Sequence, residues 1–181
     1  MNAALATRST RALLEGYAAA DMADVSVTGI ALDSRQVTPG ALFLAARGHA
    51  SHGLAHVADA LARGAAAVAW EPASGIEAPS LGIPTIVVEA LAQQVGAIAA
   101  RWYRQPSAAL FTVGITGTDG KTSTAHLIAQ ALDRLASPCA YFGTLGYGRL
   151  GRLAEASHTT PDPVRLQALL ADSRDSPEAP C

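Results

Sequence analysis

The segment from Leu110 to Ser123 constrains the fold of this 181-residue chain more than any other. Residues 110–115 are mostly apolar, which is typical of a short buried strand. Glycines follow at positions 114, 117 and 120. After them, apolar residues recur at helical spacing: Ala125, Ile128, Leu132 and Leu135. The sequence therefore predicts a strand, a glycine-rich loop and a helix in succession.

This order of elements is typical of a phosphate-binding loop. Glycines let the backbone fold closely around an anion, and the N-terminus of the following helix presents unpaired N–H groups and positive dipole. Lys121 adds an ammonium group, so a triphosphate suits the loop. The strict pattern is Gly, four residues, then Gly-Lys-Ser/Thr, and Ile115 stands where its first glycine would be. The alternative is a glycine-rich turn that binds nothing.

The composition supports the first interpretation. Twelve of the thirteen basic residues are arginine, and Lys121 is the one lysine in the sequence. A planar guanidinium and a compact ammonium are not equivalent beside a phosphate. A single lysine at this position therefore indicates that the position needs it.

Residues 117–123 resemble the ATP-binding loop of the Mur ligases, which often reads Gly-Thr-Asn-Gly-Lys-Thr-Thr. The resemblance implies that Thr122 holds Mg²⁺ and that Lys121 neutralises the β- and γ-phosphates. Asp119 stands where the family usually has Asn, and its negative charge near bound phosphate is expected to weaken nucleotide affinity. The implied ATP-binding residues are Gly117, Thr118, Asp119, Gly120, Lys121, Thr122 and Ser123.

The first 107 residues alternate short apolar runs with helical stretches, which predicts an α/β domain. Strands are expected at 41–45, 66–70 and 85–88, and helices at 57–64 and 90–103. The second helix should stop before Pro106, so residues 105–107 are the expected linker. We therefore expect a first domain over residues 1–107 and an incomplete second domain over residues 108–181.

Residues 29–35, 39–45 and 48–53 resemble the N-terminal domain of the Mur ligases, and the resemblance extends into residues 60–70. In that family the domain holds the uridine-diphosphate end of the substrate. Ser34 and the backbone near His49 can hydrogen-bond a uracil edge or ribose, and Arg35 can oppose a phosphate. The alternative for residues 33–35 is a polar turn. The implied substrate-binding residues here are Leu32, Ser34, His49, Ala50 and Ser51.

The sequence after the loop helix extends the resemblance. Residues 140–142 are expected to form a second strand, which would complete a parallel, right-handed βαβ unit. Both Gly-Thr-Leu-Gly-Tyr-Gly at 143–148 and Thr-Thr-Pro at 159–161 resemble the family member that adds the third peptide residue, and they differ from the pentapeptide-forming member.

The Thr-Thr-Pro motif implies a substrate contact. Thr159 and Thr160 would contact the muramoyl-dipeptide, with His158 in place of the usual Asn. Alternatively, these threonines cap a helix over residues 162–170. Residues 172–181 are expected to form a polar, aperiodic tail.

The resemblance implies an α/β protein in which a Mur-ligase-type uridine-binding domain precedes the start of a P-loop, parallel-sheet, Rossmann-like ATP-binding domain. The implied function is that of a ligase of peptidoglycan precursor synthesis, which uses ATP and Mg²⁺ and acts through an acyl phosphate. It would add diaminopimelate or lysine to UDP-N-acetylmuramoyl-L-alanyl-D-glutamate.

The resemblance also bounds what this sequence can do. The family's catalytic glutamate, histidine and carbamylated lysine should follow residue 181, so no catalytic set is complete in this sequence. We therefore expect a truncated chain that is inactive alone unless a separate chain carries the missing domains. The alternatives are a non-catalytic module that binds UDP-sugar or nucleotide, another Mur ligase, and a generic P-loop ATPase.

Charge and hydropathy exclude other classes. The net charge is -2 with scattered basic residues, so we expect no nucleic-acid partner. No apolar run is long enough to span a bilayer and no signal peptide is evident, which favours the cytoplasm and no membrane partner. Cys139 and Cys181 lack metal-site spacing, and His49, His52 and His56 lack a carboxylate or cysteine to complete a metal site.

Overall fold

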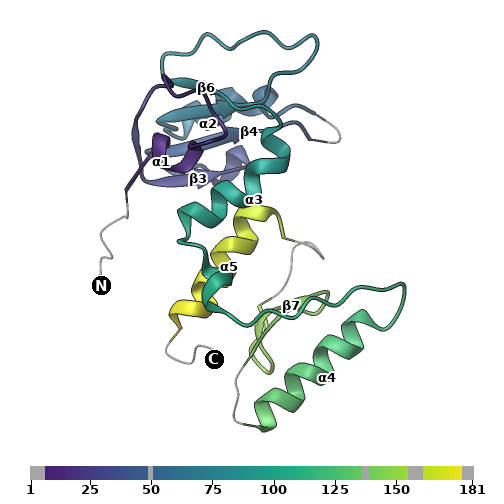
Figure 1. Cartoon of the computed structure of the whole chain (residues 1–181). Helices are drawn as coiled ribbons and strands as arrows, with labels where there is room; N and C mark the ends of the chain where they lie inside the picture. Colours follow the sequence, from purple (N-terminus) through teal and green to yellow (C-terminus); the bar gives the residue numbers. More distant parts are fainter. Residues whose placement is uncertain (1–6, 49–50, 136–138, 155–160, 177–181) are drawn as a thin grey trace. The chain divides into compact units, whose positions relative to one another are not determined.

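The computed structural model describes residues 7–48, 51–135, 139–154 and 161–176. The chain forms two units, Met1–Trp102 and Tyr103–Cys181, and Figure 1 labels several of their elements. The assignment of residues 1–107 and 108–181 to separate functional domains stays a prediction.

A parallel four-stranded sheet organises the first unit. The strands lie side by side in chain order: β3 (Gly29–Ala31), β4 (Ala41–Ala45), β5 (Ala67–Trp70) and β6 (Thr85–Val87). Every residue of the two central strands, β4 and β5, is buried. Continuous apolar runs are typical of strands covered on both faces. The predicted α/β class is therefore confirmed.

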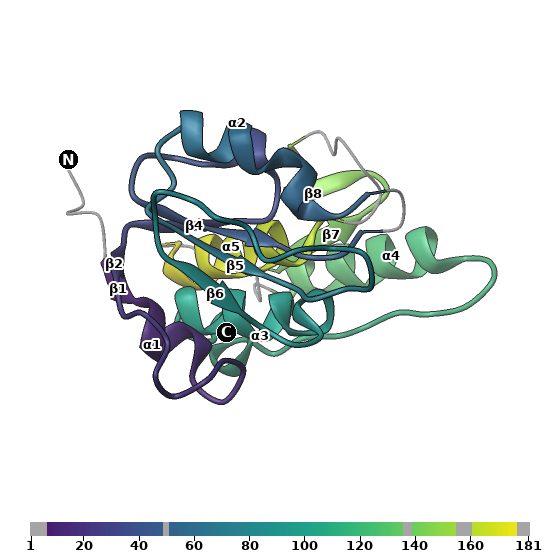
Figure 2. The same cartoon turned by 90° about the horizontal axis from the view of Figure 1, so that it is seen from above.

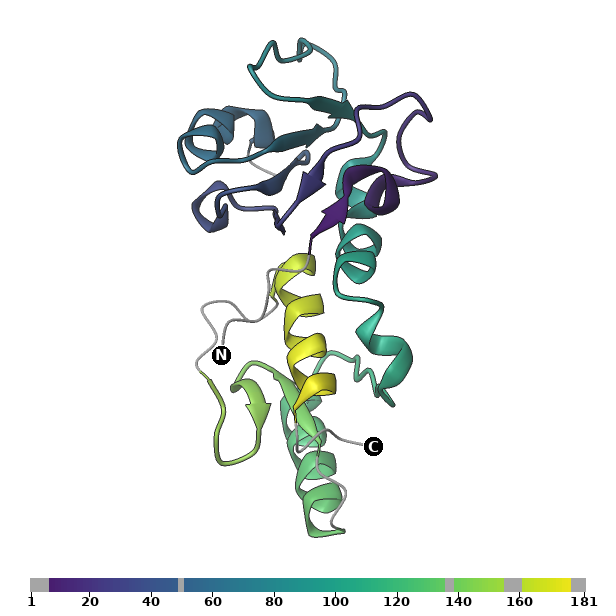
Figure 3. The same cartoon turned by 90° about the vertical axis from the view of Figure 1, so that its left-hand side faces the viewer.

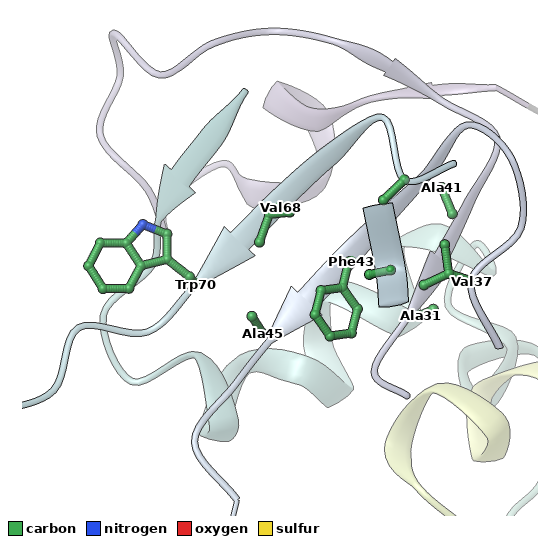
Figure 4. Close-up of a cluster of buried hydrophobic side chains, with 9 residues drawn as sticks. Ala31, Val37, Ala41, Phe43, Ala45, Val68 and Trp70 are labelled. Atoms are coloured by element: carbon green, nitrogen blue, oxygen red, sulfur yellow. The ribbon is translucent and has the colours of Figure 1, made fainter. Parts of the chain in front are cut away.

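One face of the sheet packs against α2 (Val57–Ala62). Successive side chains of a strand point to opposite faces, so Phe43 and Ala45 of β4 share one face with Val68 and Trp70 of β5. Figure 4 shows these side chains together with Val37, which precedes β4. Phe43 is 1% exposed and forms the centre of this cluster.

The other face of the sheet is covered by α3 (Leu91–Trp102), which contacts β3 and β4 and also packs against α1 (Thr10–Leu14). Figure 2 shows the sheet between α2 on one side and α1 with α3 on the other. The helix buries Leu91, Val95 and Ile98 at the helical spacing that predicts it. Several short elements were not predicted, because each is too short to show a period; among them are β3, α1, β1 (Arg8–Ser9) and β2 (Ser26–Val27), which pairs antiparallel with β1.

The second unit contains η3 (Pro106–Ala109), α4 (Lys121–Arg134), β7 (Ala140–Gly143), β8 (Gly146–Arg149) and α5 (Pro163–Asp175). Helix α5 packs against η3, and Figure 3 shows the two side by side. Arg174 of α5 donates to the carbonyl oxygens of Tyr103 and Arg104 at 3.0 and 3.2 Å. Both carbonyls directly precede η3, so this arginine fastens the helix to the start of the unit.

Two expectations for the second unit were wrong. Residues 111–116 form no regular secondary structure, and Phe111 and Val113 are 87% and 53% exposed. Strand β7 pairs antiparallel with β8, so the described residues form a hairpin and not a parallel βαβ unit. An apolar run becomes a strand only beside a hydrogen-bonding neighbour, and the described strands of this unit bond to each other. An apolar groove of about 310 Å³ lies along residues 110–115, between α4, β7 and α5.

The helix predicted over residues 162–170 extends to Asp175, so the expectation that residues 172–175 belong to an irregular tail was wrong. Asp162 caps the helix, accepting from the backbone N–H groups of Val164 and Arg165, and Pro163 occupies its first turn. The cap is therefore an aspartate. Thr159 and Thr160 lie outside the described residues. Among the described helices, none is long and apolar enough to cross a membrane.

Candidate functional site

The residues predicted to bind the substrate's uridine end follow the carboxyl ends of two neighbouring parallel strands. Leu32 and Ser34 come directly after β3, and Ser51 lies in the loop after β4. Loops at the carboxyl edge of a parallel sheet are the usual place for ligands in α/β folds. His49 and Ala50 lie outside the described residues. The sheet thus brings Leu32, Ser34 and the loop that contains Ser51 to one edge.

Residues 33–36 form a capped turn. Asp33 is the N-cap of η1 (Ser34–Gln36) and accepts from the backbone N–H of Arg35 at 2.9 Å. The Arg35 guanidinium also donates to the same carboxylate, with Nη2 2.6 Å from Oδ2. These bonds lower the pKa of Asp33 below its usual range. A phosphate approaching Arg35 would have to compete with Asp33.

Of the predicted substrate residues that the structure describes, Ser34 is the buried one, at 7% exposure. Its hydroxyl is the main cause that lowers the pKa of Asp59 of α2. Asp59 also forms an ion pair with Arg63 at 3.1 Å. No sequence pattern indicated Asp59, because its partner Ser34 lies far away in the chain. The Ser34 hydroxyl therefore lies close enough to Asp59 of α2 to influence its pKa.

The loop after β4 closes on itself. The backbone N–H of Gly53 donates to the carbonyl oxygen of Ala46 at 2.9 Å. That of Gly48 donates to the carbonyl oxygen of Ser51 at 3.0 Å. A Cβ at Gly53 would lie only 2.6 Å from the Cα of Ala45, so only glycine fits there. The predicted binding loop is therefore fixed at its base by backbone contacts.

His52 and His56 make hydrogen-bonding contacts in and around the loop after β4. His56 Nε2 lies 3.4 Å from the Ser51 hydroxyl. His52 Nδ1 accepts from the N–H of Leu54 at 3.1 Å, and its Nε2 lies 2.8 Å from the carbonyl oxygen of Glu71. Within residues 7–48, 51–135, 139–154 and 161–176, no three histidine, cysteine or acidic side chains group as a metal site.

The glycine-rich loop of the second unit leads directly into α4. Gly120 is the N-cap residue in the left-handed region at φ 75°, and Gly117 has φ 148°. No side chain caps the helix, and its first turn carries no acidic residue. The first N–H groups of a helix have no intrahelical partner. Since residues 116–121 are exposed, this helix end is open to an anion.

Two side chains of the predicted ATP loop have defined partners. The Lys121 ammonium donates back to the carbonyl oxygens of Gly117 and Thr118, at 3.1 Å for Thr118. The Thr122 hydroxyl lies 3.3 Å from that of Thr144, in the turn between β7 and β8. The sequence places Thr144 inside a family motif, but its contact with Thr122 was not predicted. His158, Thr159 and Thr160 lie outside the described residues.

Comparison with known families covers both units. Residues 26–103 match the family described as "Mur ligase family, catalytic domain". Residues 115–179 match the family described as "Mur ligase middle domain". The chain belongs to the Mur ligase family.

Two curated Mur ligases with similar sequences carry the same name. The chain is 51% identical over 148 residues to the UDP-N-acetylmuramoyl-L-alanyl-D-glutamate--2,6-diaminopimelate ligase of Pseudomonas aeruginosa, covering 82% of this chain and 30% of that protein. It is 43% identical over 162 residues to the ligase of the same name from Coxiella burnetii, covering 90% and 33%. The chain thus spans about a third of the length of these relatives.

Solved structures of Mur ligases have the same fold. A UDP-N-acetylmuramoyl-L-alanyl-D-glutamate--2,6-diaminopimelate ligase superposes with a TM-score of 0.72 at 29% identity, covering 92% of this chain and 33% of that one. The D-alanyl-D-alanyl-adding ligase of Acinetobacter baumannii superposes with a TM-score of 0.56 at 22% identity over 92% and 34%. The higher score belongs to the diaminopimelate ligase.

Proposed function

We propose that this chain is the part of a diaminopimelate-adding Mur ligase that binds UDP-N-acetylmuramoyl-L-alanyl-D-glutamate and the phosphates of ATP. The observation that carries the proposal is the 51% identity to the Pseudomonas aeruginosa ligase over 148 residues, which is 82% of this chain. The relatives' name also favours diaminopimelate over lysine as the third residue.

The first unit would bind the uridine end of the substrate at the carboxyl edge of its sheet. Leu32 offers an apolar surface for the base, and Ser34 and Ser51 offer hydroxyls that donate or accept. The predicted site also includes His49 and Ala50, with Thr159 and Thr160 for the dipeptide. The burial of Ser34 beside Asp59 supports a polar contact in this site.

The second unit would bind the phosphates of ATP with residues 117–123. The fit is chemical: α4 begins with an uncapped, exposed N-terminus, an ammonium and a hydroxyl stand at its first two positions, and two glycines adopt positive φ. Such a helix end favours anions. The Thr122 hydroxyl is the candidate ligand for Mg²⁺, and when bound Mg²⁺ neutralises charge on the β- and γ-phosphates.

The proposed reaction is amide formation driven by ATP. Transfer of the γ-phosphoryl group to the D-glutamate carboxylate makes an acyl phosphate and ADP, and attack by the diaminopimelate amine then releases phosphate. Lys121 would stabilise the charge that moves onto the leaving ADP. The described residues would supply two binding sites, but they offer no group that positions the amine, and positioning accounts for about 7 to 11 kcal/mol of such a barrier.

The test is incubation of the 181-residue chain with ATP, Mg²⁺, diaminopimelate and UDP-N-acetylmuramoyl-L-alanyl-D-glutamate, together with calorimetric titration of the UDP substrate. We expect substrate binding and at most slow ATP hydrolysis. Absence of binding would contradict the proposed substrate site. Tripeptide formed at a normal enzymatic rate would show that the chain completes catalysis by itself. The second candidate, a binding module without catalysis, makes the same binding prediction, and it would be excluded by that product.

A further inference from the structure

Glu71 contacts three parts of the first unit at once, although no sequence pattern singled it out. It directly follows β5, and its Oε2 accepts from the backbone N–H of Arg47 at 3.1 Å and from that of Ala92 at 3.0 Å. Its backbone carbonyl oxygen lies 2.8 Å from Nε2 of His52. Arg47 and His52 face each other across an isolated antiparallel bridge at the base of the predicted uridine-binding loop.

The ring of His52 is held as one tautomer. Its Nδ1 accepts a hydrogen bond from the N–H of Leu54, so in the neutral ring the proton lies on Nε2. That N–H then donates to the Glu71 carbonyl. The Glu71 side chain therefore binds one side of the loop base, through the backbone of Arg47. Its carbonyl oxygen binds the other side, through His52.

The carboxylate of Glu71 accepts hydrogen bonds from two backbone N–H groups. Ala92 lies in the first turn of α3, where unpaired N–H groups favour a negative charge. Ala90, just before that helix, adopts φ 51° and carries only a methyl group, so it cannot cap the helix with its side chain. A carboxylate aimed at the diphosphate itself would repel it. Glu71 is therefore placed to act on the loop and not on the ligand.

We propose that Glu71 is a positioning residue of the uridine-diphosphate site, which with His52 fixes the bridge between Arg47 and His52 at the base of the predicted binding loop. This inference rests on the proposed function of the first unit. The simpler role for Glu71 is that of a cap for α3, which would affect stability alone. The two roles differ in whether ligand affinity changes in variants that remain folded.

The experiment is calorimetric titration of the chain with uridine diphosphate, with thermal unfolding and ATP affinity measured in parallel. The variants are Glu71→Ala, Glu71→Gln, His52→Asn and the matched control Glu77→Ala, an exposed carboxylate on the loop after β5. Asn at position 52 can still accept from the N–H of Leu54, but its side chain is too short to reach Glu71. His52→Asn therefore removes the hydrogen bond to the Glu71 carbonyl oxygen and leaves the Glu71 cap of α3 intact. Lys121→Ala locates the binding, because uridine diphosphate held in the first unit is insensitive to it.

Glu71→Ala is expected to weaken uridine-diphosphate binding by about tenfold or more, since it removes two charge-assisted hydrogen bonds. His52→Asn should weaken it by about threefold to tenfold. Glu71→Gln keeps an acceptor oxygen and should stay within about threefold of the wild type. Glu77→Ala should bind normally, and ATP affinity should be unchanged in all four variants.

The results of these titrations distinguish the proposed function of the first unit from the positioning role of Glu71. A wild-type chain that binds no uridine diphosphate overturns the proposed function of the first unit. A wild type that binds, with Glu71→Ala and His52→Asn binding equally well, overturns the positioning role and leaves Glu71 as a helix cap. If Glu71→Ala does not fold, His52→Asn decides the question, because its normal affinity would contradict the inference.

Discussion

The hydroxyl oxygen of Thr122 lies 3.3 Å from that of Thr144. Thr122 is in the first turn of α4, and Thr144 is in the turn that joins β7 to β8. A hydroxyl that coordinates a cation presents a lone pair to it and must direct its proton elsewhere. The Thr144 hydroxyl oxygen can accept a hydrogen bond from the Thr122 hydroxyl. The β7–β8 turn can therefore orient the proposed metal ligand.

Replacing Thr144 by Val should therefore weaken nucleotide binding only when the metal is present. Loss of one neutral hydrogen bond predicts about threefold to tenfold lower affinity for ATP with Mg²⁺ and no change for ATP with excess chelator. Calorimetric titration under both conditions measures this. Thr112→Val, an exposed threonine outside the loop, is the control. Equal losses with and without Mg²⁺ would show that Thr144 does not act through the metal ligand.

The sequence predicted the elements whose own side chains determine them. Strands β4 and β5 are continuous apolar runs buried on both faces, and α3 repeats Leu91, Val95 and Ile98 on one side. A helix after the glycine-rich loop followed from the apolar residues at helical spacing from Ala125 on, although α4 already begins at Lys121. In each case the local pattern and the burial agree, so local reasoning is enough.

The rest depends on partners far away in the chain. Residues 110–115 have the composition of a strand, but no described neighbour pairs with them. Strand β3 has three residues, too few to show a period. Glu71 bonds to backbone groups 24 and 21 positions away, and no spacing rule identifies such contacts. The residues of the two candidate sites stay predictions until ligands are measured.

Gly53→Ala should destabilise the first unit. The added Cβ would lie 2.6 Å from the Cα and 2.7 Å from the carbonyl carbon of Ala45. These atoms belong to a buried strand of the sheet, so moving them would cost free energy. We expect a loss of about 1 to 3 kcal/mol in the free energy of unfolding, measured by urea denaturation. Gly82→Ala is the control, since its Cβ would meet nothing within 4 Å. Equal stability of the two variants would contradict the close approach.

Asp33 should give the first unit a dependence on acid pH. Its folded-state pKa lies below the ordinary 3.8 because of Arg35, so its contribution to stability is present above pH 3.8 and is lost as pH falls through the folded pKa. Asp33→Asn keeps a capping oxygen but removes the charge. The variant should be less stable than the wild type at neutral pH, by about 0.5 to 1 kcal/mol.

This difference should shrink as the pH falls below 3.8, because the wild-type carboxyl group becomes neutral as well. Urea denaturation of both proteins at a series of pH values from neutrality down to about pH 3 measures it, with Asp119→Asn, an exposed carboxylate of the other unit, as the control. A difference that is independent of pH would show that the charge of Asp33 contributes nothing.

Asp119→Asn should strengthen nucleotide binding. The substitution removes a negative charge from the exposed loop that would hold the phosphates, while the shape of the side chain is nearly unchanged. At a partly exposed site we expect a gain of about 1 kcal/mol in binding free energy, which should diminish at high salt. Calorimetric titration with ATP and Mg²⁺ at two ionic strengths checks both effects. Unchanged affinity would place the carboxylate away from the phosphates.

The most direct test of the proposed ATP site is calorimetric titration of the wild type, Lys121→Ala and Lys121→Arg with ATP and Mg²⁺. The ammonium of Lys121 lies over the carbonyl oxygens of Gly117 and Thr118, at the loop where the phosphates would bind. If residues 117–123 bind the phosphates, Lys121→Ala should lower ATP affinity by about 10- to 100-fold. Lys121→Arg should also weaken binding, because a planar guanidinium group does not replace a compact ammonium. Equal affinities for the wild type and Lys121→Ala would contradict the assignment of residues 117–123 as the ATP site.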